Sequence, residues 1–97
     1  MYLGGVRLWD TTLKVGQWHD IKMQVCWSTS DTVGWVRLWY NGVPQNFVNG
    51  AGTFTVRTLI PGTTTAYYKE GIYRQATTPT DIVYHTGFRC ALTEAAL

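Results

Sequence analysis

The sequence feature that most constrains the fold is Asn41-Gly42, which separates two segments of β-type composition. Both residues tolerate positive φ, and this pair is the strongest short signal for a two-residue hairpin turn. Residues 35–40 alternate with a period of two, which divides their side chains between two faces: Val36, Leu38 and Tyr40 on one, and Trp35, Arg37 and Trp39 on the other. Residues 43–48 are the expected return strand. Pro44 has no N–H to donate, which indicates an edge position or a pairing that does not need this N–H. The pattern predicts an antiparallel hairpin.

Further segments of the same kind predict an antiparallel all-β chain of roughly six or seven strands. The other expected strands cover residues 6–9, 19–27, 54–60, 65–74 and 82–89. Polar or turn-forming residues separate them, at 28–33, 49–52, 61–62 and 75–80. Residues 91–97 are the one segment that could be helical, and a helix of that length is not stable alone.

Length and charge bound the classes of function. At 97 residues and 45% hydrophobic content, the chain is expected to form one domain over residues 1–97. The net charge of +2 is spread without a basic run, which argues against nucleic acid as a partner and is compatible with an anionic saccharide. No apolar run of about 18 residues is present, so no membrane span is expected. The first residues lack the charged and apolar regions of a signal peptide.

Cys26 and Cys90 are the only cysteines. They are too few for a disulfide framework and lack the spacing of a zinc site. Two states remain open: one bridge between an early strand and the last strand, or two buried free thiols. We favour the free thiols.

Residues 67–74, Tyr-Tyr-Lys-Glu-Gly-Ile-Tyr-Arg, are the most informative for function, because they crowd three phenols and two cations into a chain otherwise short of charge. In an extended backbone the side chains divide between two faces: Tyr67, Lys69 and Tyr73 on one, and Tyr68, Glu70, Ile72 and Arg74 on the other. Gly71 suggests a bulge or the close approach of a ligand. A phenol and an ammonium on one face could move a proton beside an anionic substrate. A solvated lysine and a packing tyrosine are the alternative.

A second group, Trp35, Arg37 and Trp39, could stack sugar rings and bind a carboxylate. The interpretation that we favour is that this face packs against a second layer, with Arg37 reaching its edge. His19 and His85 are expected to be structural.

Other polar residues give weaker signals. Arg74 is expected in an ion pair with Glu70 or at the surface, and contact with an acidic substrate is the alternative. The six acidic residues are scattered and form no glycosidase-type pair. No motif of metal ligands is present.

The order of three segments resembles one enzyme family: Gly-Gln-Trp-His-Asp-Ile at 16–21, Gly-Trp-Val-Arg-Leu-Trp-Tyr-Asn-Gly at 34–42, and Tyr-Lys-Glu-Gly-Ile-Tyr-Arg at 68–74. Over residues 15–89 the chain is similar to the C-terminal part of polysaccharide lyases of the heparin lyase and glucuronan lyase type. The third segment is the most specific, since laminin G-like and pentraxin-like sandwiches share the first two. The resemblance implies a concanavalin A-like jelly-roll β-sandwich, here partial, secreted, and acting on an acidic polysaccharide.

The resemblance also implies roles for individual residues. It places Lys69 and Tyr73 in the active site, as charge stabiliser and acid/base of a β-elimination beside a uronic acid. Tyr67, Arg74 and the Trp35, Arg37, Trp39 group are then candidates for substrate binding. Some jelly-roll lyases hold calcium, but no residue here specifies a calcium site, and no cofactor is identified.

The chain also departs from that family. The family's enzymes are longer, and they contribute a histidine and a glutamine or arginine from further upstream, so we do not assign the catalytic histidine to His19. A non-catalytic carbohydrate-binding β-sandwich module therefore stays open as an alternative, as does a structural module without a ligand. An exposed sheet face could be covered by a second copy, which makes a homodimer an expectation as well.

Overall fold

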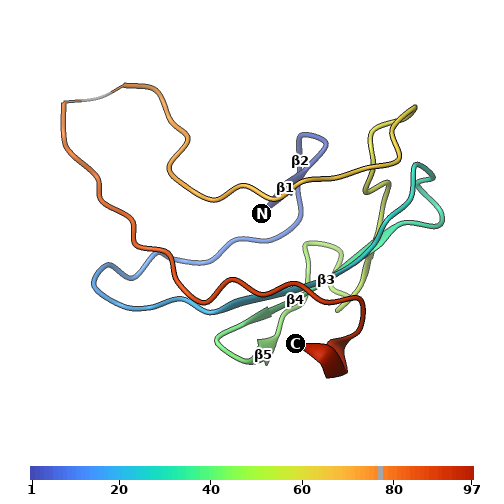
Figure 1. Ribbon diagram of the computed structural model, residues 1–97, viewed down its shortest axis with the longest axis horizontal. Coiled ribbons are helices and arrows are strands. Elements are labelled where there is room, and N and C mark those ends of the chain that lie inside the picture. The colour runs from blue at the N-terminus through green and yellow to red at the C-terminus, as the bar shows by residue number, and fades with distance from the viewer. Residues whose placement is uncertain (77) are drawn as a thin grey trace. The chain divides into compact units, whose positions relative to one another are not determined.

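A computed structural model describes residues 1–76 and 78–97, which fall into two compact units (Figure 1). Unit 1 is Met1–Thr65 and unit 2 is Ala66–Leu97. Among the described residues, all regular strands belong to unit 1, and all of them pair antiparallel. The predicted all-β antiparallel class is confirmed, and the layers of unit 1 are consistent with part of a β-sandwich.

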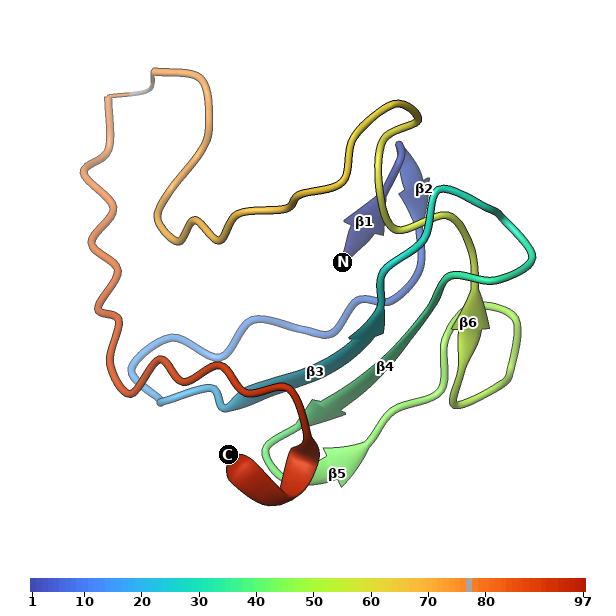
Figure 2. The same ribbon diagram turned by 45° about the vertical axis from the view of Figure 1, so that its right-hand side comes forward.

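The main sheet is built around β4 (Trp35–Tyr40). β3 (Ile21–Cys26) pairs with it along its whole length. On its other side, β5 (Val43–Pro44) pairs with one end and β6 (Phe54–Thr55) with the other (Figure 2).

The turn between β4 and β5 has the predicted form. Asn41 and Gly42 have φ of 50° and 79°, and Tyr40 pairs directly with Val43, so the loop is a two-residue type I′ turn. Pro44 lies in β5, which pairs with β4 alone among the described strands, so the predicted edge position is confirmed.

Other strands are shorter than predicted. The return strand ends at Pro44. Gln45 N–H still donates to the Leu38 carbonyl (2.9 Å), but the chain then turns away from β4 because the Phe47 side chain is buried in the core. The strand expected at residues 54–60 is regular only in β6. At the N-terminus, β1 (Tyr2–Leu3) pairs with β2 (Val6–Arg7), a hairpin of which the sequence pattern indicated the second strand alone.

The hydrophobic core lies on one face of β4. Val36 and Leu38 are 2% and 3% exposed, and Leu8 and Phe47 complete the buried cluster. Leu8 belongs to the N-terminal segment, which is tied to the loop after β5 by a hydrogen bond from Val48 N–H to the Leu8 carbonyl (2.9 Å). Because neighbouring residues of a strand point to opposite faces, Trp35, Arg37 and Trp39 of β4 lie away from this core.

Thr58 and Gly34 join the far end of the sheet to the segment after β6. The buried Thr58 hydroxyl donates to the Cys26 carbonyl and accepts from Ser28 N–H, both at 2.7 Å. Gly34 accepts a hydrogen bond from Val56 N–H at 2.8 Å, and a Cβ on Gly34 would lie 2.4 Å from the Val56 carbonyl oxygen. These contacts hold the chain close to the sheet where the β6 ladder has ended.

Two of the predicted strands, both in unit 2, are not present in the structure. Residues 65–74 and 82–89 were expected to be strands, and neither contains a regular strand. No described residue of unit 2 is buried, so no apolar face there drives the two segments into a ladder. The regular element among the described residues of unit 2 is a short 3₁₀ helix, η1 (Glu94–Ala96), within the segment where a helix was considered.

The two segments of unit 2 nevertheless pair through their side chains. The Tyr68 ring stacks on Phe88 at 4.0 Å between centroids. Further along, Glu70 Oε2 lies 3.4 Å from His85 Nδ1, and Arg74 Nη2 lies 3.0 Å from Asp81 Oδ2. Each step forward along the first segment is matched by a step back along the second, which is antiparallel order without backbone pairing.

Two remaining predictions concern cysteines and membranes. Both cysteines are free, as favoured, but the expected burial is wrong, since Cys26 is half-buried and Cys90 is exposed. Among the residues that the structure describes, no helix has the length and apolar character needed to cross a bilayer.

Candidate functional site

The three tyrosines of the tyrosine-rich segment in unit 2 lie in different surroundings. Tyr68 donates its hydroxyl proton to Glu70 Oε2 at 2.7 Å. This hydrogen bond, together with partial desolvation and the nearby negative charge, raises the pKa of the Tyr68 phenol above its ordinary value. Tyr68 is therefore held in its protonated form and is a poor proton acceptor.

Tyr67 and Lys69 contact each other on the other face of this segment. Lys69 Nζ lies 4.9 Å from the centroid of the Tyr67 ring, within the range of a cation–π interaction. These contacts agree with the predicted division of side chains for residues 67–70 and Arg74, since Tyr68, Glu70 and Arg74 all contact the segment that follows Pro79.

Tyr73 stands apart from the other two tyrosines. Its side chain is fully exposed, and its hydroxyl makes no hydrogen bond to any described residue. Gly71, two residues earlier, has φ of 148°, a conformation that only glycine adopts without strain. Because residues 65–74 form no regular strand, the bulge or ligand approach expected at Gly71 stays a prediction, and Tyr73 follows Gly71 with a phenol open to solvent.

Arg74 lies at the surface, which is one of the two placements predicted for it. In place of the other, an ion pair with Glu70, its guanidinium contacts the Asp81 carboxylate and donates to the Pro79 carbonyl at 3.0 Å. The reason is that Glu70 is engaged by Tyr68 and His85. His85 contacts Glu70, in agreement with the structural role expected for it.

The outer face of β3 and β4 in unit 1 carries a row of aromatic and cationic side chains. The register pairs Lys22 with Trp39, Gln24 with Arg37 and Cys26 with Trp35, so all six share one face. Lys22 Nζ lies 4.1 Å from the Trp39 ring centroid, and Arg37 Cζ lies 5.0 Å from that of Trp35. The core lies on the opposite face. Arg37 is exposed, as expected for a side chain that reaches the edge of a layer, and Trp35 and Trp39 are half-buried, so the second layer over this face stays a prediction.

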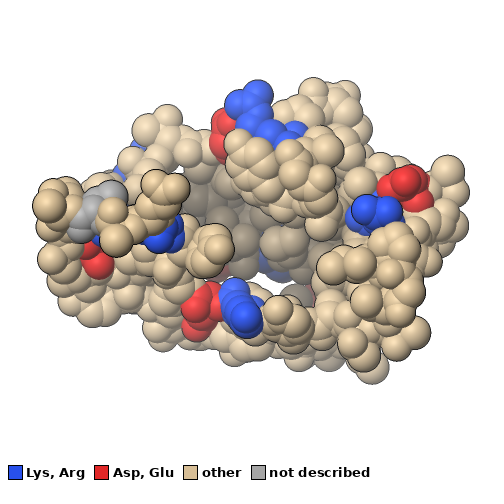
Figure 3. Space-filling model, turned by 90° about the horizontal axis from the view of Figure 1, so that it is seen from above, with Lys and Arg blue, Asp and Glu red and all other residues tan. Residues whose placement is uncertain are grey.

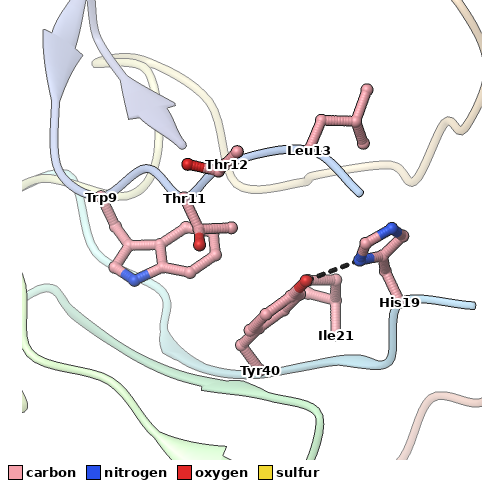
Figure 4. A pocket seen from close by; sticks show the side chains of 7 residues that line it. All are labelled: Trp9, Thr11, Thr12, Leu13, His19, Ile21 and Tyr40. Atoms are coloured by element: carbon pink, nitrogen blue, oxygen red, sulfur yellow. Dashed lines mark hydrogen bonds between the residues drawn. The ribbon is translucent and has the colours of Figure 1, made fainter. Parts of the chain in front are cut away.

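A small pocket lies in unit 1 beside the start of β3 (Figure 4). Its walls are mainly apolar and aromatic, and its lining residues are Trp9, Thr11, Thr12, Leu13, His19, Ile21 and Tyr40. Its volume of about 180 Å³ is below the ~300–1,000 Å³ of most small-molecule sites.

His19 and Tyr40 form a hydrogen-bonded pair at the edge of this pocket. His19 Nε2 lies 2.8 Å from the Lys14 carbonyl, which can only accept, so Nε2 carries the proton of the neutral ring. Nδ1 then accepts the Tyr40 hydroxyl at 2.6 Å (Figure 4). The histidine thereby connects the irregular segment at Lys14 to the sheet, in agreement with the structural role expected for it.

Charge is distributed in small groups. On the face shown in Figure 3, lysine and arginine side chains lie in separate places, several of them beside an acidic side chain. Arg7 with Asp10 (2.7 Å) is one such pair. In the described part of the chain, no three His, Cys, Asp or Glu side chains gather around a point that could hold a metal ion.

The structure thus brings the predicted site residues into two groups, one in each unit. Unit 2 holds Lys69, Tyr73, Tyr67 and Arg74, and unit 1 holds Trp35, Arg37 and Trp39. Sequence reasoning missed Lys22 and Thr53, which contact the second group. The strand register that brings Lys22 to Trp39 depends on an irregular connection at residues 27–34, and no sequence signal fixes it.

Comparison with known proteins identifies the same broad family as the three sequence segments described above. A family model described as polysaccharide lyase matches residues 2–89. No curated protein and no solved structure gives a significant match. The matched region takes in both groups of candidate residues and nearly the whole chain, and the chain therefore belongs to the polysaccharide lyase family.

Proposed function

We propose that this chain is the polysaccharide lyase domain, or part of one, of an enzyme that cleaves a uronate-containing acidic polysaccharide by β-elimination. The observation that carries the proposal is Tyr73. It lies in the Tyr-Lys-Glu-Gly-Ile-Tyr-Arg segment inside the family match, and it is the tyrosine of this segment with a fully exposed, unengaged hydroxyl.

The reaction assigns Tyr73 a base and an acid role in turn. The Tyr73 phenolate removes the proton at C5 of the uronate, and the electron pair of that C–H bond forms the C4=C5 double bond. The C4–O bond to the leaving sugar breaks, and the leaving oxygen takes a proton from the Tyr73 phenol. Atoms and charge balance without a further reactant, and the products are an unsaturated uronide and a new chain end.

Lys69 is assigned the role of stabilising the negative charge that develops on the uronate. Removal of the C5 proton places negative charge on the carboxylate, and a cation nearby stabilises it. Lys69 is exposed and precedes Tyr73 by four residues, at most about 14 Å along an extended chain. The Tyr67 ring contacts the Lys69 ammonium and limits the positions that it can take. Lys69 and Tyr73 can then flank one sugar unit. Because the substrate is an extended polysaccharide, the proposal includes a secreted enzyme.

The test is the near-ultraviolet absorbance of unsaturated uronide when the chain is mixed with glucuronan, heparin or alginate. Tyr73→Phe removes the proton-transfer group while keeping the ring, and the rate is expected to fall by about 10²- to 10⁴-fold. Tyr84→Phe is the matched control, an exposed tyrosine of the same unit outside the proposed site, and is expected to retain most of the rate. Full activity in Tyr73→Phe would sink the assignment.

A non-catalytic carbohydrate-binding module is the second candidate. The aromatic and cationic face of unit 1 favours it, because saccharide binding there needs no proton transfer. Binding without product formation, unchanged by Tyr73→Phe, distinguishes this candidate from the lyase.

A further inference from the structure

We propose that Arg37 is a pre-organised receptor for a carboxylate of an acidic saccharide chain, on a binding surface of unit 1. The surface, here called the Arg37 face, consists of Trp35, Arg37 and Trp39 of β4 with Lys22 of β3. The choice of a uronate as the carrier of the carboxylate rests on the proposed function. The geometry of the carboxylate receptor is independent of the proposed function.

The Arg37 guanidinium is fixed at two points. Its Cζ lies 5.0 Å from the Trp35 ring centroid, and its Nε–H donates to Thr53 Oγ1 at 3.0 Å. Thr53 belongs to the loop before β6, so two elements of unit 1 hold the group. A charged side chain that is already ordered loses less conformational entropy when it binds a ligand.

The contacts that fix Arg37 leave its far edge available. Neither Nη1 nor Nη2 makes a hydrogen bond to a described residue, and the side chain is exposed. The two terminal amino groups form a planar fork whose spacing matches the two oxygens of a carboxylate. Since Nε is occupied by Thr53, the ligand is expected to approach end-on, through Nη1 and Nη2.

The surroundings of Arg37 favour an acidic sugar over other anions. Trp35 and Trp39 stand two residues to either side, about 7 Å away along the strand, and offer half-buried indole surfaces to the apolar faces of sugar rings. Lys22, whose ammonium lies over Trp39, adds a second positive charge to the same face. None of the positions on this face of β3 and β4 is acidic. A polymer that alternates ring faces with carboxylates fits this order of groups.

Binding should be measured by calorimetry in the full chain carrying Tyr73→Phe, so that turnover does not consume the ligand. The ligands are a glucuronan oligosaccharide, its carboxyl-reduced neutral form, and dextran sulfate. We expect glucuronan to bind and the neutral form to lose at least tenfold in affinity. Preference for dextran sulfate over glucuronan would overturn the carboxylate assignment.

Arg37→Lys is the decisive variant, because it keeps the charge but removes the fork and the bond to Thr53. Its affinity for glucuronan is expected to fall about tenfold. Arg57→Lys makes the same chemical change at another exposed arginine of unit 1 and should bind as the parent does. Equal affinities of the Arg37 and Arg57 variants would overturn the proposal. Thr53→Val, which loosens Arg37 without altering it, should weaken binding by a few-fold and serves as a second variant.

This experiment separates the two proposals. Suppose that Arg37→Lys loses affinity and that the chain with Tyr73 intact forms no product. The carboxylate receptor would then stand, and the lyase activity would be contradicted. Product formation that depends on Tyr73, with affinity unaffected by Arg37→Lys, would do the reverse.

Discussion

Units 1 and 2 each contain two segments in antiparallel order, but backbone hydrogen bonds join only one of these pairs. In unit 1, β3 and β4 pair at six consecutive positions. In unit 2, residues 68–74 and 81–88 are connected through side chains at three points, without a described strand. Both pairs come from sequences with a period of two and with β-type composition.

The difference between the two pairs shows what alternation needs in order to become a sheet. β4 buries Val36 and Leu38 against Leu8 and Phe47, whereas no described residue of unit 2 is buried. Each fully buried aliphatic side chain stabilises the fold by roughly 1.5–3 kcal/mol, which helps to offset the entropy of ordering a strand. The exposed contacts of unit 2 contribute far less, because solvent screens them.

The largest expected effect comes from breaking the core of unit 1. Leu38→Ala should lower the free energy of unfolding by about 2–5 kcal/mol, because it leaves a cavity between β4 and Leu8. Ile72→Ala in unit 2 is the control and should change it by less than about 0.5 kcal/mol, since Ile72 is partly exposed and belongs to no core. Urea denaturation measures both. Similar losses in the two variants would mean that unit 2 has a core of its own.

Gly34→Ala tests the contact that extends the sheet of unit 1 beyond β6. The added methyl would lie 2.4 Å from the Val56 carbonyl oxygen, a backbone atom, so a loss of about 1–3 kcal/mol is expected. Gly52→Ala is matched to it, because its nearest neighbour would be 3.8 Å away, and it should be neutral or slightly stabilising. Thermal unfolding of the two variants gives the comparison. A neutral Gly34→Ala would show that residues 56–58 are not held to the sheet.

The smallest expected effect concerns the side-chain contacts of unit 2. The hydrogen bond to Glu70 raises the pKa of Tyr68, so the stabilisation by this contact is present below the ordinary tyrosine pKa and is lost as pH rises through the raised value. Glu70→Ala should therefore lower the pKa of Tyr68 toward about 10. NMR titration of labelled tyrosine follows it, with exposed Tyr2 as the internal reference. An unchanged Tyr68 titration would contradict the contact.

Much of unit 1 was predictable, for local reasons. The turn at Asn41-Gly42 depends on residues that accept positive φ, and the burial of Val36 and Leu38 follows from alternation next to that turn. The length of β5 was not predictable, because the chain leaves the sheet so that Phe47 can reach Leu8, which lies far away in sequence.

The sequence predicted which residues belong to the candidate site, but it did not predict the contacts that these residues make. Residues 67–74 stand out by composition and by their resemblance to a lyase segment, and the proposed roles of Lys69 and Tyr73 still rest on that resemblance. That Tyr68 is bound to Glu70 whereas Tyr73 is open could not be read from the order of residues, because both are tyrosines in similar local sequence. The pairing of Arg37 with Thr53 likewise needed the loop before β6 to return beside β4.

The sequence by itself determined the all-β class, the central hairpin and the polysaccharide lyase family, since these depend on periodicity, turn chemistry and short ordered motifs that survive without knowledge of distant contacts. Only the tertiary structure decided which alternating segments became strands and which side chains kept an unengaged polar group. Both depend on what lies across from a residue in space, and burial and hydrogen-bond partners come from segments that the local sequence does not specify.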